Sequence, residues 1–182
     1  GLMYVSGELR KKLGNQSHFF HRGKTRNMLT PAGPDHAQIA AVAGIVDYFD
    51  GVYEHHFDDQ VDSAARGRCL YQLFSQHEKS LLKPLLNFLK GREDVRIIGP
   101  DDASVRVATV AVLPLEKSVT DVSAALNREK LMVGSGDFYG VRPLTAMGIA
   151  LEPGVLRMSF VHYTSMDDIT RLVAGLERAL DD

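Results

Sequence analysis

Apolar residues recur at the three-to-four-residue spacing of an α-helix in several stretches of the chain. The first long stretch begins at Asp35 and ends at Gly51, and because it is apolar nearly all round we expect a buried helix. The second begins at Ser63 and continues to Gly91, with Pro84 expected to kink it. The pattern thus predicts two long helices in the first half of the chain.

Capping signals predict three further helices. Ser118 with Asp121, and Ser165 with Asp168, match the capping-box pattern of a hydroxyl residue followed three positions later by an acidic one. Each pair stands directly before an apolar stripe, so a helix is predicted after each. A shorter helix is predicted over residues 6–13, with a serine as its cap.

Strands are predicted where β-branched or alternating apolar residues gather, in the segments 2–5, 95–98, 105–113, 131–133 and 155–162. Residues 15–34 have little apolar periodicity and are predicted to form a loop, while 142–147 is short enough for a single helical turn. The order of elements after residue 94 predicts an α/β fold class, with a mixed sheet covered on one face by helices.

Composition narrows the class of protein further. The 182 residues are 45% hydrophobic and 24% charged, which excludes disorder, collagen and coiled coil. A formal net charge of -2 gives no field that would recruit nucleic acid or an anionic membrane, and no apolar run is long enough to span a bilayer. The single cysteine, Cys69, excludes an intrachain disulfide and a multi-cysteine zinc site, so we expect a cytoplasmic protein without a metal.

The last predicted strand carries the first candidate for chemistry. Alternation puts Leu156, Met158 and Phe160 on one face and Arg157 with Ser159 on the other. A guanidinium on that second face could bind a carboxylate through two hydrogen bonds. A solvent-facing arginine is the more frequent outcome of such a pattern, and the alternation alone leaves both interpretations open.

Two loops could also approach a ligand. The glycine-bearing turn at 134–142 contains Phe138, Tyr139 and Arg142, which are unusual in an idle loop, although a plain hairpin turn would look similar. The segment 30–35 stands directly before a helix start, where free amides favour an anion such as a phosphate. Helix capping by an aspartate is the commoner use of such a segment.

Three segments become more informative when they are taken together. They are Gly-Pro-Asp-His-Ala-Gln-Ile-Ala-Ala at 33–41, Gly-Asp-Phe-Tyr at 136–139 and Val-Leu-Arg-Met-Ser-Phe-Val-His-Tyr-Thr at 155–164. In this order and spacing they resemble the class V aminotransferase family, and within it the cysteine desulfurase-like branch. The similarity extends over essentially the whole chain but covers only the C-terminal part of that family's fold.

The resemblance implies a fold type I enzyme that uses pyridoxal 5'-phosphate and forms homodimers. Residues 1–60 would be the tail of the large domain, 61–92 a connecting helix and 93–182 the small domain. Arg157 would bind the α-carboxylate of an amino-acid substrate. Gly33 and Thr30 would approach the cofactor phosphate of the neighbouring subunit, and Phe138, Tyr139 and Arg142 would shape the pocket for the substrate side chain.

Two departures from the family pattern limit the activity that is expected. The lysine that forms the Schiff base has no match in this chain, so the chain alone is expected to be inactive, with that lysine upstream. The persulfide-forming cysteine of the desulfurases is replaced by the stretch 136–139, which disfavours sulfur transfer. Transamination is therefore the preferred hypothesis. β-Elimination from cysteine or selenocysteine and a non-catalytic interaction module are its alternatives.

Overall fold

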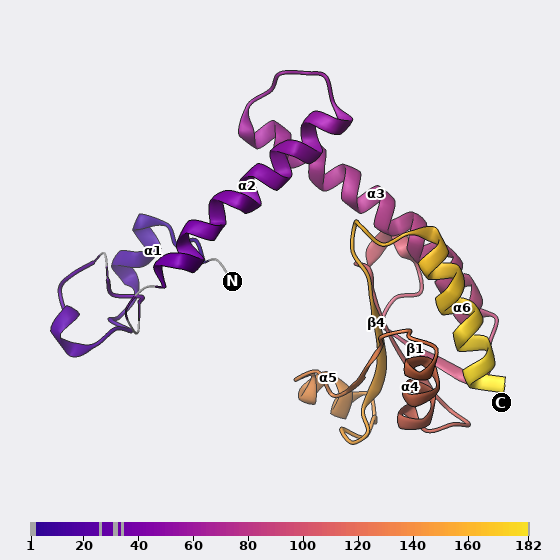
Figure 1. The fold of residues 1–182 in the computed structure, drawn as a ribbon. Helices are drawn as coiled ribbons and strands as arrows, with labels where there is room; N and C mark the ends of the chain where they lie inside the picture. Colours follow the sequence, from indigo (N-terminus) through magenta and orange to yellow (C-terminus); the bar gives the residue numbers. More distant parts are fainter. Residues whose placement is uncertain (1–2, 26, 31–32, 34, 182) are drawn as a thin grey trace. The chain divides into compact units, whose positions relative to one another are not determined.

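A computed structural model describes residues 3–25, 27–30, 33 and 35–181 of the chain. The chain divides into two compact units, Gly1–Gln60 and Val61–Asp182. Both are drawn in Figure 1, and each is described here by itself.

The first unit contains α1 (Gly7–Lys12), the short 3-10 helix η1 (Phe19–His21) and α2 (His36–His56). The backbone N–H of Leu9 donates to Ser6 Oγ at 3.1 Å, so the predicted serine cap of α1 is confirmed. The predicted strand at 2–5 is wrong for residues 3–5, which belong to no strand, and Leu2 lies outside the described residues. Within the described part of the chain no strand pairs with residues 3–5, and a strand requires such a partner.

Helix α2 differs from its prediction in length and in burial. It continues beyond Gly51 to His56, because one interior glycine costs only about 1 kcal/mol and does not stop a helix. Among the described residues of α2 only Tyr53 is buried, while Ile39 is 59% and Val46 53% exposed. The expectation of a buried helix is therefore wrong for this chain. Apolar residues all round show that a helix favours burial, and they do not supply the surface that would cover it.

The second unit begins with the long helix α3 (Ser63–Lys90), which contains Pro84. The elements that follow it, in chain order, are β1 (Val95–Ile98), η2 (Ala103–Val105), β2 (Thr109–Pro114), α4 (Val119–Arg128), β3 (Gly134–Gly136), α5 (Val141–Ala146), β4 (Val155–Ser159) and α6 (Met166–Asp181). The two predicted capping boxes are confirmed. Ser118 Oγ accepts the N–H of Asp121 at 3.0 Å, and Ser165 Oγ accepts the N–H of Asp168 at 3.1 Å.

The four strands form one sheet in the order β1-β2-β4-β3, and every neighbouring pair is antiparallel. The α/β class is confirmed, but the expectation of a mixed sheet is wrong. The strand predicted at 131–133 is displaced to β3, because Gly134 to Gly136 are the residues that pair with β4. Pairing with a neighbour decides the position of so short a strand more strongly than its own composition does.

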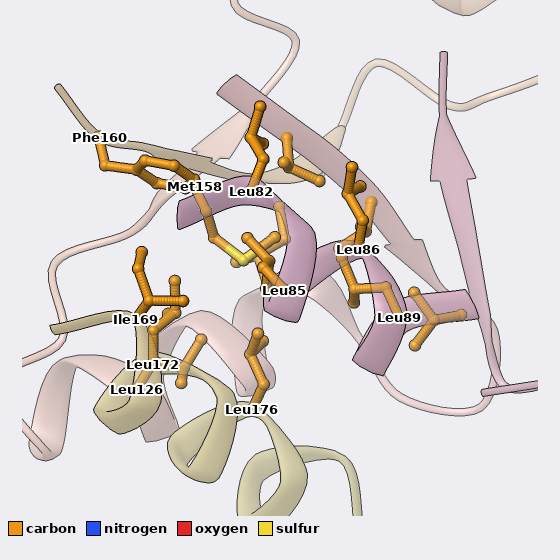
Figure 2. Packing of buried hydrophobic residues seen from close by; sticks show 14 of the residues in the cluster. Leu82, Leu85, Leu86, Leu89, Leu126, Met158, Phe160, Ile169, Leu172 and Leu176 are labelled. Carbon is orange, nitrogen blue, oxygen red and sulfur yellow. The ribbon is translucent and has the colours of Figure 1, made fainter. Parts of the chain in front are cut away.

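A single large core holds the second unit together (Figure 2). Leu82, Leu85, Leu86 and Leu89 of α3 meet Met158 and Phe160 of the β4 segment and, from α6, Ile169, Leu172 and Leu176. Helices α3, α4 and α6 cover this face of the sheet, while α5 lies toward the other (Figure 1). A smaller cluster there is formed by Leu144, Ile149 and Val155. The sheet therefore has a heavily covered face and a lightly covered one.

Among the residues that the structure describes, no helix is long and apolar enough to cross a membrane.

Candidate carboxylate-binding site

The candidate site lies on the lightly covered face of the sheet, where β4 presents Arg157. Its neighbours Leu156 and Met158 are buried in the large core, at 0% and 2% exposure. Arg157 itself is half-buried and shares its side of β4 with Val155, a member of the smaller cluster. This is the alternation that the sequence predicts, and it brings the guanidinium to the sheet face that α5 only partly covers.

Small residues flank Arg157 on both sides. Ala111 of β2 and Gly134 of β3 are its cross-strand partners. Directly opposite residues in an antiparallel pair would normally place side chains within about 5 Å of each other. A methyl group on one side and no side chain on the other leave open space next to the arginine. The ring of Phe138 fills it, since a Cβ built on Gly134 would lie 2.9 Å from Phe138 Cζ.

The guanidinium of Arg157 stacks on that ring. Its Cζ lies 3.8 Å from the centroid of Phe138, well inside the range of a cation-π contact. No ion pair or hydrogen bond joins Arg157 to another side chain within the described part of the chain. The structure thus combines two features at one point: a guanidinium held by an aromatic face, and in-plane N–H groups that are not committed to a carboxylate.

A tight turn carries Phe138 back over the sheet. Asp137 begins it: its backbone carbonyl accepts the N–H of Gly140 at 2.8 Å, and its carboxylate accepts the N–H of Tyr139 at 3.0 Å. Phe138 and Tyr139 have positive φ angles of 49° and 60°. Positive φ at both central positions is typical of a type I′ turn, in which glycine or asparagine is normally found. Two aromatic residues here are held in a backbone conformation that residues with a Cβ disfavour.

Gly154, directly before β4, fixes the other end of this arrangement. A Cβ on Gly154 would lie 2.2 Å from the carbonyl carbon of Gly136, so the two backbones touch. This contact holds the end of β3 against the residue that precedes β4. The sequence prediction includes Gly134 in the ligand-approaching turn at 134–142 but misses Gly154. The only sequence signal for this close packing was the pair of glycines in Gly-Ser-Gly, which were interpreted as part of the turn.

The other residues proposed for the substrate pocket lie farther from this contact. Tyr139 follows Phe138 in the turn, but its side chain is 99% exposed. Arg142 lies in the first turn of α5 and is also exposed. The structure therefore brings Arg157 and Phe138 together and leaves Tyr139 and Arg142 at the surface, where their role as pocket residues stays a prediction.

The residues proposed for the cofactor phosphate lie in the first unit. Thr30 is half-buried and its N–H donates to the carbonyl of Asn27, while a Cβ on Gly33 would meet nothing within 4 Å. The carboxylate of Asp35 accepts the N–H groups of Ala37 and Gln38, which are the amides that a helix start would offer an anion. The described residues of this chain therefore do not form a phosphate cradle by themselves, and their role toward a cofactor stays a prediction.

The residues that the structure describes contain no group of three or more histidine, cysteine, aspartate or glutamate side chains able to hold a metal ion. Cys69 is half-buried on α3, far along the chain from the turn at 137–140.

Comparison with known proteins identifies the family of this chain. The sequence profile of the family described as Aminotransferase class-V matches residues 70–172. An aminotransferase-like protein of Gibberella zeae is 23% identical over 98% of this chain and 42% of its own length. A cysteine desulfurase of Pectobacterium carotovorum is 30% identical over 57% of this chain and 24% of its own. The chain thus spans less than half the length of these relatives.

The fold itself recurs in solved structures. The cysteine desulfurase CsdA of Escherichia coli superposes with a TM-score of 0.61 and 19% identity, over 84% of this chain and 32% of that one. An identity this low supports the fold and leaves the reaction open.

Proposed function

Because this chain belongs to the class V aminotransferase family, we propose that it is the C-terminal portion of a pyridoxal 5'-phosphate enzyme that acts on an amino acid. In this proposal Arg157 binds the α-carboxylate of the substrate. The first unit is the tail of the large domain, residues 61–92 are the connecting helix, and residues 93–182 are the small domain.

The observation that carries this proposal is the state of the Arg157 guanidinium. It lies on the lightly covered face of the sheet, half-buried, against an aromatic ring and without a carboxylate partner in the described part of the chain. A cation held in this way gains most from a carboxylate, because the planar fork matches both carboxylate oxygens. A purely structural, half-buried arginine would be expected to use its donors within its own chain, as Arg106 does with the carbonyls of Pro100 and Thr109.

The cofactor would be held mainly by residues outside this chain. Pyridoxal phosphate acts as an electron sink for bond breaking at the substrate Cα, and its Schiff-base lysine is proposed to lie upstream. The chain alone is then inactive, and it contributes the group that orients the substrate. Transamination in a cytoplasmic homodimer is our preferred activity, with Tyr139 and Arg142 facing the substrate side chain.

Replacing Arg157 tests the proposal in the longer, cofactor-loaded protein. Arg157→Gln keeps hydrogen-bonding capacity but removes the charge and the fork, so KM for the amino acid should rise about 100-fold. Arg171→Gln is the matched control, since Arg171 lies on α6 with 61% of its side chain exposed. Equal KM values for the Arg157→Gln variant and the unaltered protein would rule out Arg157 as the carboxylate-binding residue.

Product analysis separates transamination from the β-elimination alternative, which the similarity to cysteine desulfurases supports. A 2-oxo acid that forms only with an amino acceptor indicates transfer. Alanine that forms from cysteine without an amino acceptor, with sulfide released once an added thiol reduces the departing sulfur, indicates elimination. The turn at 137–140 contains no cysteine to receive sulfur, which is why we place transfer first.

A further inference from the structure

We propose that Phe138 is a positioning residue for Arg157: its ring holds the guanidinium in the one orientation that leaves the two-nitrogen edge open to a carboxylate. This inference rests on the proposed function and deepens it. It assigns Phe138 a role through the arginine, in place of contact with the substrate side chain.

The geometry of the stack supports this role. With Cζ 3.8 Å from the ring centroid, the flat face of the guanidinium is covered by the ring. All N–H donors of a guanidinium lie in its plane, so a ring against its face leaves them available for hydrogen bonds. The ring therefore restricts the rotation of a long and flexible side chain without using any of its donors. A carboxylate side chain in the same place would fix the arginine equally well but would occupy the fork.

The strand opposite Arg157 is built to admit the ring. Phe138 Cζ and Cε1 would lie 2.9 Å and 3.0 Å from a Cβ on Gly134, which is closer than ordinary van der Waals contact. A side chain at this position would require the ring of Phe138 to shift. Gly134 is also the direct cross-strand partner of Arg157, so the missing side chain lies next to the charge.

The turn holds Phe138 in place at a conformational cost. Phe138 and Tyr139 have positive φ, while Gly140, which could adopt such a conformation freely, does not. Strain of this kind persists where surrounding contacts over-determine the backbone, and it gathers at functional positions. The contact between Gly154 and Gly136 and the two hydrogen bonds to Asp137 provide those surrounding contacts.

Nuclear magnetic resonance of the 15N-labelled chain tests the stack directly. The Nε–H proton of Arg157, assigned by its loss in Arg157→Lys, should be shifted upfield by the ring of Phe138. The shift should persist in Phe138→Tyr, which keeps the aromatic face, and disappear in Phe138→Leu. Tyr139→Leu is the matched control for this signal, because it removes the neighbouring aromatic residue of the same turn, also at positive φ. A signal that does not respond to Phe138→Leu overturns the inference.

Acetate, the simplest carboxylate, then tests whether the held orientation matters for binding. Titration should move the Arg157 signal in the unaltered chain and in Phe138→Tyr. In Phe138→Leu the affinity should fall about two- to fivefold, as expected for loss of a partly exposed cation-π contact. This readout needs neither cofactor nor turnover, and a side chain with a purely structural role would not move it.

The outcomes separate the two proposals. Equal acetate affinity in Phe138→Leu and the unaltered chain overturns the positioning role while Arg157 remains the carboxylate-binding residue. An upfield signal that acetate never moves overturns both proposals, and the stack is then packing only. Loss of the upfield shift together with weaker acetate binding, both restored in Phe138→Tyr, supports the inference.

Discussion

The two units of this chain differ in how far their apolar side chains are buried. In the second unit, α3, α4, α6 and the sheet enclose a continuous core in which leucines such as Leu82 and Leu85 are fully buried. In the first unit, α2 is more apolar along its length than α3, yet it buries only Tyr53 among its described residues. Burial therefore depends on complementary surfaces and cannot be read from the hydrophobicity of one helix. Four matched pairs of measurements test this contrast.

Hydrogen exchange should show the largest difference. Amides of α3 next to Leu82 and Leu86 should exchange only through global unfolding, because their side chains lie in the main core. Amides in the middle of α2 should open locally, so their exchange should be more than about 100-fold faster. Mass spectrometry of peptides from the two helices measures this. Equal protection of both helices would remove the contrast between the units.

Truncation of core leucines should give the next largest effect. Leu85→Ala should lower the free energy of unfolding by about 2 to 5 kcal/mol, because a fully buried side chain leaves a cavity. Ile45→Ala in α2, where the side chain is 47% exposed, should change it by less than about 0.5 kcal/mol. Urea denaturation of both variants measures the difference. A comparable loss in Ile45→Ala would show that α2 is covered.

Alanine substitutions at two glycines with similar positive φ test how closely other atoms approach the backbone in the two units. Gly154→Ala should lower the free energy of unfolding by about 3 kcal/mol. Two effects contribute, because the new Cβ would clash with the backbone of Gly136 and because alanine is strained at a φ of 76°. Gly23→Ala, at φ 81° with nothing within 4 Å, should cost about 1 kcal/mol from strain alone. Thermal denaturation checks the pair, and similar costs would argue against close backbone contact at Gly154.

Removal of one ion pair from each unit should give the smallest difference in the free energy of unfolding. The Arg92 guanidinium donates to Asp94 at 2.7 Å and holds the pKa of that carboxyl below its ordinary value of 3.8. A lowered pKa in the folded state stabilises the fold above pH 3.8, and this contribution is lost as the pH falls through the lowered value. Asp94→Asn should therefore lower the free energy of unfolding by about 1 to 2 kcal/mol at pH 7, and by progressively less as the pH falls below the lowered pKa.

The matched pair in the first unit is Lys12 with Glu8, whose side chains are 71% and 82% exposed. Glu8→Gln should lower the free energy of unfolding by less than about 0.5 kcal/mol, because exposed ion pairs of this spacing contribute little to stability. Urea titrations at pH 7 and pH 2 measure both variants. A pH-independent cost for Asp94→Asn would show that the carboxylate charge is not what stabilises the fold there.

Local signals in the sequence predict the fold well where the physics is local. The capping boxes at Ser118 and Ser165 are confirmed because each depends on residues within three positions. The displaced β3 strand and the antiparallel sheet could not be predicted in this way, since both depend on pairing with β4 across a long stretch of chain. The prediction that α2 is buried failed for the same reason, because the surface that would cover a helix comes from residues far away in the sequence.

The candidate site shows the same division. Strand alternation correctly places Arg157 on the face opposite Leu156 and Met158. The contact with Phe138 could not be predicted from spacing, because it needs the absent side chain of Gly134 on the neighbouring strand and a turn with two positive φ angles. The roles of Tyr139, Arg142, Thr30 and Gly33 stay predictions, which the variants of the intact protein can test.

The outermost strand beside β4 has a consequence for solubility. β3 contains only three residues, Gly-Ser-Gly, and the chain turns sharply away directly after it. Such an edge exposes few main-chain groups to which a foreign strand could add, and it offers no apolar side chains to hold one. The short glycine-containing strand whose Gly134 makes room for the ring of Phe138 therefore also protects this side of the sheet against edge-to-edge aggregation.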